Sequence, residues 1–366
     1  MSTEALDAAP SFPLAGLVKP LVQPLVAVAI AVLVGGLLVL ALGENPIEVY
    51  SILVHGSLVG WPNFLVTLQM MSPLLFTGLA VAISFRAGLW NIGAEGQMIM
   101  GALAAGIVGY AVDLPTALHI PLALIAAFAG GLAWALLPAL LRVWLNLNEL
   151  VVCLMLNPIA LLLSGYVSTH LLKAPGPTNK LPDIADTAAL PTFSLYSQVN
   201  AGFVIGLVLC LVFAVVNGGT KKGFEWKIMG LNPRFAYYGG IRVPLQAVLV
   251  MMLSGGIAGL GGAEQVLGEY RAFYDNFSPG YGFDGIAVAM LANFHPVGVV
   301  LAAFLFGALN GGSAVLQMMT GLSKYLVQVL QFIIVLILAA QFSWAFLGSR
   351  RKAPPAHAAP AAPKEE

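Results

Sequence analysis

Polar and charged side chains interrupt the apolar sequence between Phe85 and Gln97. The segment reads Phe-Arg-Ala-Gly-Leu-Trp-Asn-Ile-Gly-Ala-Glu-Gly-Gln, so one carboxylate and two amides stand among three glycines. In a membrane such groups would be costly against lipid, because hydrocarbon offers them no hydrogen-bond partner. If the surroundings lie in a membrane, we therefore expect this segment to face other protein or a polar cavity.

The composition is that of an integral membrane protein. Of the 366 residues, 59% are hydrophobic and only 9% are charged, against roughly 25% charged residues in a soluble domain. The 16 basic and 16 acidic residues cancel, which gives no indication of nucleic-acid binding. Cys153 and Cys210 lie inside apolar runs, where we expect small buried side chains rather than a disulfide or metal ligands.

Apolar runs long enough to span, or nearly span, a bilayer recur along the chain. They fall at about residues 22–43, 64–85, 93–112, 118–141, 149–172, 200–217, 243–262, 281–295, 297–318 and 325–347. The predicted fold class is all-α, a polytopic membrane protein with about ten transmembrane helices. No small-residue cleavage site follows the first run, so we expect a retained helix rather than a signal peptide. Glycines interrupt residues 255–262, so one re-entrant segment is compatible with the pattern.

The basic residues predict the orientation, since short loops rich in Lys and Arg stay in the cytoplasm. Ten spans with both termini inside leave four basic residues outside: Lys173, Lys180, Arg271 and Lys324. The other twelve then lie inside: Lys19, Arg86, Arg142, Lys221, Lys222, Lys227, Arg234, Arg242, Arg350, Arg351, Lys352 and Lys364.

This orientation divides the chain into three parts. We expect a cytoplasmic tail at residues 1–20, a transmembrane domain at 21–348, and a disordered cytoplasmic tail rich in Ala and Pro at 349–366. Within the domain, residues 173–200 form a proline-rich outer loop and residues 217–242 form a basic inner loop.

Two compatible interpretations of the segment between Phe85 and Gln97 remain open. In the first, the glycines permit close packing or a break between helices, and Glu95 caps the second helix, whose dipole favours a negative charge there. In the second, Asn91, Glu95 and Gln97 line a translocation path or its cytoplasmic gate. Arg86 would cost about 2.5 to 3.5 kcal/mol at the bilayer centre, which places it at the inner interface and the whole segment near the cytoplasmic mouth.

Other polar residues are further candidates. Asn157 in the fifth run could either touch a solute or kink its helix, and Asp284 is a second candidate carboxylate of the path. The remaining acidic residues of this part are expected in an outer loop, where solvation is favoured over contact with a partner protein. They are Glu264, Glu269 and Asp275.

The inner loop contains the layout of a short helix. Asn232 can cap it, Pro233 suits its first turn, and Gly239-Gly240 ends it. A short cytoplasmic helix with aromatic side chains is suited to a groove of a partner protein. The alternative is an ordinary connecting loop with aromatic residues at the lipid interface.

Three stretches together resemble a known family. They are Phe85–Gln97, Gly230–Ile241 and Gly282–Leu291, the last leading to Pro296. They resemble the permease subunits of bacterial ATP-binding-cassette (ABC) importers, in the family of ribose, branched-chain amino acid and nucleoside permeases. The first stretch is similar to the nucleoside-type branch more than to the others. The resemblance implies a type II-like importer permease of the cell inner membrane, which transports nucleosides or a similar small polar solute.

The resemblance also implies that the inner loop carries a coupling helix for an ATPase subunit. The residues assigned to this contact are Met229, Gly230, Leu231, Asn232, Pro233, Arg234, Phe235, Ala236, Gly239 and Gly240. Relatives usually have Arg-Ala before the coupling Gly-x-Asn and paired alanines after it, whereas this chain has Lys227-Ile228 and Phe235-Ala236. Coupling to an ATPase is still expected, and the groove of its ATPase need not match that of the relatives' ATPases.

The chain has no Gly-x-x-x-x-Gly-Lys-Ser/Thr phosphate loop. ATP hydrolysis is therefore expected in another polypeptide, and the chain itself is expected to be no enzyme and to need no cofactor or metal. The implied partners are an ATP-binding ABC subunit, a second homologous permease subunit, an external substrate-binding lipoprotein and membrane lipid, with no nucleic acid.

Two alternatives stay open. The first is a simple-sugar ABC importer permease. The second is an ion-coupled secondary transporter, in which Glu95 and Asp284 would bind protons or sodium.

Overall fold

A computed structural model of the chain describes residues 14–194, 197–323, 325–329, 331–333 and 336–337. Within these residues the chain forms helices and no strand, which agrees with the predicted all-α class. Most of the expected N-terminal tail, the end of the last apolar run and the expected tail at 349–366 lie outside the described residues.

Six described helices are long and apolar enough to cross a membrane. They are α3 (Trp61–Arg86), α5 (Thr116–Leu145), α6 (Glu149–Tyr166) with its continuation to Leu171, α7 (Ala201–Gly219), α10 (Val243–Ala263) with its continuation to Tyr270, and α12 (Pro296–Thr320). The part Val28–Ala41 of α1 (Leu14–Ala41) and the helix α2 (Pro46–Leu58) are bent by 119° relative to each other. They are a seventh candidate if they form one span. The described residues thus contain six or seven such spans, whereas the apolar runs predict ten.

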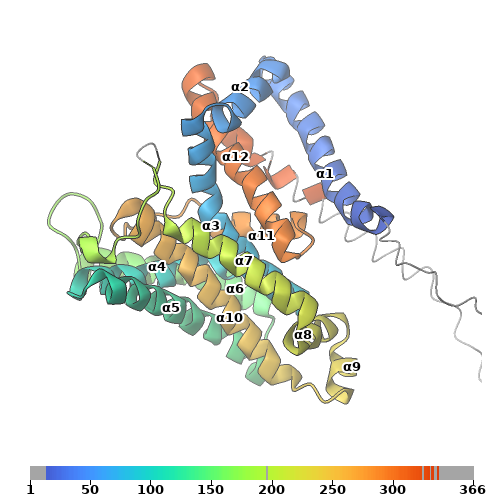
Figure 1. Cartoon of the computed structure of the whole chain (residues 1–366), viewed down its shortest axis with the longest axis vertical. Coiled ribbons are helices and arrows are strands. Elements are labelled where there is room, and N and C mark those ends of the chain that lie inside the picture. The colour runs from blue at the N-terminus through green and yellow to red at the C-terminus, as the bar shows by residue number, and fades with distance from the viewer. Residues whose placement is uncertain (1–13, 195–196, 324, 330, 334–335, 338–366) are drawn as a thin grey trace, which may run out of the picture.

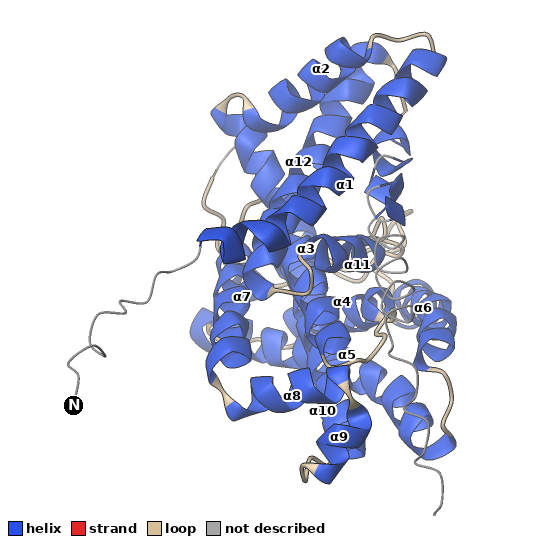
Figure 2. Ribbon diagram, turned by 90° about the vertical axis from the view of Figure 1, so that its right-hand side faces the viewer, coloured by secondary structure: helices blue, strands red, loops and turns tan. Residues whose placement is uncertain are grey.

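The remaining α-helices are shorter or more polar. They are α4 (Ala94–Ala111), α8 (Lys221–Leu231), α9 (Pro233–Tyr238) and α11 (Tyr281–Leu291). Figure 1 shows α8 and α9 at the end of α7 and α10 that lies opposite the loop before α7. In Figure 2, α11 lies beside α3, and the two helices pack against each other.

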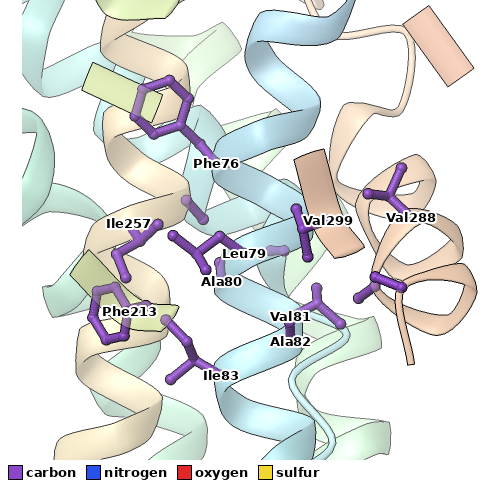
Figure 3. Close-up of a cluster of buried hydrophobic side chains, with 14 of the residues drawn as sticks. Phe76, Leu79, Ala80, Val81, Ala82, Ile83, Phe213, Ile257, Val288 and Val299 are labelled. Carbon is purple, nitrogen blue, oxygen red and sulfur yellow. The ribbon is translucent and has the colours of Figure 1, made fainter. Parts of the chain in front are cut away.

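The core is centred on α3. In its most apolar window 72% of the residues are buried, against 22% in the corresponding windows of α5 and α6. Figure 3 shows Ile83 of α3 beside Phe213 of α7, with Ile257 of α10 on the same side of α3. Cys153 and Cys210 are buried and unpaired, which confirms the prediction for both.

Glycines let α5 and α10 pack backbone against backbone. A Cβ atom at Gly131 would overlap the carbonyl oxygen of Gly255, and one at Gly259 would overlap that of Ala127. Small residues in this role replace the hydrophobic driving force that helices in lipid lack. The glycines therefore mark close packing rather than a break, because α10 is continuous from Val243 to Ala263.

The apolar runs do not predict α2. Asn45 accepts a hydrogen bond from the Ile47 amide at 3.0 Å, and Pro46 occupies the first helical position. This Asn-Pro pair is a typical helix start, and it is the sequence signal that the apolar runs miss. The boundary between the expected N-terminal tail and the first helix also differs. Helix α1 begins at Leu14 and so includes the last residues of that tail.

Candidate functional site

The connection between α3 and α4 turns back into the helix bundle. After α3 ends at Arg86, the Asn91 side chain donates to Ser254 Oγ at 2.8 Å, and Ser254 donates to the Ala80 carbonyl at 2.7 Å. Ala80 lies six residues before Arg86, which is about 9 Å along the helix. Asn91 therefore lies at a different level of the bundle from Arg86, whereas the prediction placed the whole segment at the level of Arg86. The position of Arg86 does not fix that of the rest of the segment, because non-helical backbone is tolerated inside protein.

Asn91 and Gln97 bind each other. Asn91 Nδ2 donates to Gln97 Oε1 at 2.8 Å, and Gln97 Nε2 donates to Asn91 Oδ1 at 2.9 Å. Asn91 also accepts the Gly93 amide at 3.1 Å, and both side chains are fully buried. Buried amides that satisfy each other fix a backbone conformation. Neither residue lines the cavity described below, so the structure favours the packing interpretation for this pair.

Glu95 caps a helix other than its own. Glu95 lies in the first turn of α4, where the prediction places its charge, but the hydrogen bond of its carboxylate goes to another helix. Its carboxylate instead accepts the backbone amide of Gly282, the second residue of α11, at 2.6 Å, and it also interacts with Ser278. A negative charge is stabilised at this end of α11 by the helix dipole. The sequence could not reveal this contact, because it joins residues 187 positions apart.

Asn157 performs the capping of α4 from the neighbouring helix. Its Oδ1 atom accepts the Gly96 amide at 3.0 Å, and its Nδ2 atom donates to the Ile92 carbonyl at 3.0 Å. The first amides of a helix have no partner within that helix, so Asn157 ties α6 to the start of α4. Of the two predicted roles, contact with a solute is compatible with this position, because Asn157 also lines a cavity.

A cavity of about 380 Å³ lies beside these contacts. Its size falls in the range of small-molecule sites. The polar residues of its wall are one carboxylate, two amides and two hydroxyls: Glu95, Asn157, Asn276, Ser164 and Ser278. Its aromatic residues are Phe273, Phe277 and Phe283, and its described wall contains no Lys or Arg. The predicted path residues therefore separate, with Glu95 and Asn157 at the cavity and Asn91 and Gln97 elsewhere.

Asp284 lies near this cavity without lining it. The residue is in the first turn of α11, half-buried, and its carboxylate interacts with the Asn310 side chain of α12. Sequence reasoning missed Asn276, Ser278 and the three phenylalanines. They follow the helix that ends at Tyr270, and only the folded chain brings this segment to Glu95.

The acidic residues expected in an outer loop include a buried one. Glu264 is 2% exposed and lies in the π-helical continuation of α10. It accepts hydrogen bonds from Asn200 at 2.9 Å and from Gln265 at 2.8 Å. The prediction of a solvated Glu264 is wrong, because the helix continues past the glycines and these amides satisfy the carboxylate inside the protein. Gln265 also donates to Glu269 at 3.2 Å.

The inner loop forms two helices rather than one. Asn232 accepts the Phe235 amide at 3.0 Å, Pro233 begins α9, and Gly239 follows its last residue, all as predicted. Met229, Gly230 and Leu231, however, belong to the end of α8. The two helices are separate because Pro233 disfavours a helical conformation at the residue before it, and Asn232 is extended.

A set of apolar and aromatic side chains is exposed on α8 and α9. Its members are Phe224, Leu231, Phe235, Tyr237 and Tyr238, each at least 60% exposed. Gly230 faces the opposite way, and a Cβ atom there would overlap the Arg86 carbonyl oxygen and lie 3.0 Å from the Gly88 nitrogen. The end of α8 therefore lies directly on the connection between α3 and α4.

Comparisons with known proteins agree with this architecture. Residues 63–339 match the model of the family described as branched-chain amino acid transport system / permease component. The chain is 35% identical over 337 residues to the guanosine ABC transporter permease protein NupP of Bacillus subtilis, covering 91% of this chain and 97% of that protein.

Two further relatives have similar coverage. The glucose ABC transporter permease protein TsgB13 of Haloferax volcanii is 33% identical, over 86% of each chain. The nucleoside ABC transporter permease protein NupB of Lactococcus lactis is 30% identical, over 88% of this chain and 92% of that protein. The chain therefore belongs to the branched-chain amino acid transport system permease family and is a multi-pass membrane permease of the ABC transporter type.

Proposed function

We propose that the chain forms the translocation path of an ATP-driven importer for nucleosides or a similar small, uncharged polar solute. The observation that carries this proposal is the cavity beside Glu95 and Asn157. Two of the relatives described above are named as nucleoside or guanosine permeases, which supports the same solute class.

The cavity wall has the chemistry that a nucleoside needs. Phenyl rings such as those of Phe277 and Phe283 can stack on a flat base, and amides such as that of Asn276 can bind its polar edge. Glu95 is the one ionisable residue of the described wall. A phosphorylated solute would meet this carboxylate and no basic partner, so we expect the cavity to accept nucleosides and to reject nucleotides.

A simple sugar is the second candidate solute. The glucose permease of Haloferax volcanii supports it, at 33% identity over 86% of this chain. The ion-coupled alternative has no such support among the relatives. A sugar would use the amides and hydroxyls of the wall, whereas a nucleoside would also use the phenyl rings.

We further propose that α8 and α9 bind the ATPase subunit on the cytoplasmic side. Their exposed aromatic side chains form an amphipathic surface suited to a groove of a partner.

With α8 and α9 on the cytoplasmic side, residues 173–200 lie outside, where the substrate-binding lipoprotein would dock, and both termini lie inside. A homologous permease would complete the membrane part. We propose ten spans in all, a type II-like importer, and the expected division into two tails and one transmembrane domain.

The test is uptake by the reconstituted complex of this permease, its homologous partner, the ATPase and the binding lipoprotein. Accumulation of labelled guanosine inside proteoliposomes should depend on ATP. Unlabelled nucleosides should compete with this uptake, whereas glucose and guanosine monophosphate should not. Competition by glucose alone would favour the sugar candidate. Uptake driven by an ion gradient without the ATPase would overturn the proposal.

A further inference from the structure

One end of the connection between α3 and α4 touches α8, the helix that we propose contacts the ATPase. Gly230 of α8 packs on the backbone at Arg86 and Gly88, so closely that a side chain at either glycine has no room. Gly88 has φ +76° and a Cβ atom there would lie 3.0 Å from the Gly230 Cα atom. This is a contact between backbones, with no flexible side chain to absorb a displacement of α8.

The middle of the connection is held as a unit. Leu89 is buried and its amide donates to the Ser84 carbonyl at 2.9 Å. Asn91 is bonded to Gln97 and to Ser254, as described above. Leu89 and Asn91 are buried although Trp90 between them is exposed, and their hydrogen bonds join the middle of the connection to α3, α4 and α10. We therefore expect this part to move with those helices.

The other end of the connection holds two walls of the cavity. Glu95 binds the Gly282 amide at 2.6 Å, and a Cβ atom at Gly282 would overlap the Glu95 backbone nitrogen. Gly96 is bonded to Asn157 of α6 at 3.0 Å. A shift of the start of α4 must therefore reach the start of α11, and also α6.

We propose that residues 86–96 transmit movement of α8 to the cavity, with Gly230 and Glu95 as the positioning residues at the two ends. When the ATPase displaces α8, the contact of Gly230 with Arg86 and Gly88 shifts the connection. Glu95 then carries the start of α11 with it, which changes the opening of the cavity. This inference rests on the proposed coupling of α8 and α9 to an ATPase.

The first experiment compares Gly230→Ala with Gly219→Ala in the complete reconstituted complex. Gly219 ends α7 and has no atom within 4 Å of an added Cβ, so it is a matched control. We expect Gly230→Ala to lower the amount of solute imported per ATP hydrolysed by about tenfold. This factor is typical of the coupling between two distant sites of a protein. The Gly219→Ala control should match wild type in import per ATP and in copurification with the ATPase. Unchanged import per ATP in Gly230→Ala would overturn the inference.

The second experiment tests the other end of the same path. Glu95→Ala removes the acceptor of the Gly282 amide, and we expect about a tenfold loss of import per ATP. Glu95→Gln keeps an oxygen acceptor and should recover most of it, which a requirement for the charge itself would not allow. The double variant with Gly230→Ala should be no worse than either single variant, because both break one path. Multiplied losses would contradict a shared path.

A measurement on the wild-type complex covers the case in which these variants fail to assemble. Trapping the ATPase with ATP and vanadate should change amide hydrogen exchange in residues 86–96 and in residues 278–284 together. Exchange that changes in α8 but in neither of these segments would overturn the inference. Failure of the proposed function is distinct, because the wild-type complex would then show no ATP-driven import at all.

Discussion

Glu95 and Glu264 are both carboxylates buried in apolar helical surroundings, but they are bonded in different ways. Glu264 is 2% exposed and is held by the side-chain amides of Asn200 and Gln265. Glu95 is 7% exposed, is held by the backbone amide of Gly282, and lines a cavity. Burial of a charge therefore does not by itself mark a transport path.

The bonding explains why the two carboxylates serve different purposes. Asn200 caps α7, so Glu264 joins the start of that helix to the continuation of α10. Such a closed set of hydrogen bonds stabilises one arrangement of helices. Glu95 joins two helix starts next to an open space, where a change in one bond can alter the shape of the cavity.

The largest expected effect of this difference is on stability. Glu264→Ala removes one acceptor from each of the Asn200 and Gln265 amides, which keep their bonds to Gln198 and Glu269. Each buried N–H group left unsatisfied costs roughly 1 to 3 kcal/mol. We expect a clear fall in the thermal unfolding temperature of the detergent-solubilised complex, while the solute preference stays the same. Glu44→Ala, at an exposed acidic residue, is the control. If Glu264→Ala instead changed solute preference at unaltered stability, the contrast with Glu95 would be lost.

A smaller effect is expected at the aromatic wall. Phe277→Ala removes a stacking surface that is worth about 1 to 3 kcal/mol per base in proteins that bind nucleobases. The concentration for half-maximal guanosine import should therefore rise by about fivefold or more. Phe277 also packs against Tyr270 and Phe273, so thermal unfolding is measured alongside import. Phe332→Ala, at an exposed ring outside the cavity, should leave import unchanged. Equal effects of the two variants would argue against a solute in this cavity.

The smallest effect is expected at an exposed ion pair of the proposed outer loop. Lys180 donates to Asp183 at 2.6 Å, and this hydrogen bond raises the pKa of the Lys180 ammonium. The pair therefore stabilises the folded state below the ordinary lysine pKa and loses this contribution as pH rises through the raised pKa. Because the pair is exposed, Lys180→Met should change stability by about 0.5 kcal/mol or less at pH 7. A larger loss in thermal unfolding would show that charge pairs at the surface matter as much as buried ones.

The sequence predicts much of the helical frame. Observed helices such as α7 and α10 begin and end within two residues of their apolar runs, because the demand for hydrocarbon-compatible length is local. The N-cap Asn232 and the helix start at Pro233 can be predicted for the same reason, because these signals are also local. The missed helix α2 carries its signal in Asn45-Pro46 rather than in an apolar run.

The site was less predictable, because its contacts are between distant residues. Glu95, Asn157 and the segment around Phe277 meet only after folding. Likewise, the hydrogen bonds between Asn91 and Gln97 and the contact of Gly230 with Gly88 depend on the path of the backbone between the helices. The pattern of residue types does not predict that path. The residue types indicated polar groups inside a membrane, but they could not distinguish a bonded cluster from a cavity wall.

The most direct test of the central claim is labelling of a cysteine placed in the cavity. Asn276→Cys introduces an exposed thiol in its wall, while the natural Cys153 and Cys210 are buried. We predict that a small, positively charged methanethiosulfonate reagent modifies Asn276→Cys in the assembled transporter. Guanosine should slow this reaction, and guanosine monophosphate should not. Equal labelling rates with and without guanosine, in a complex that still imports it, would contradict the assignment of this cavity to the solute path.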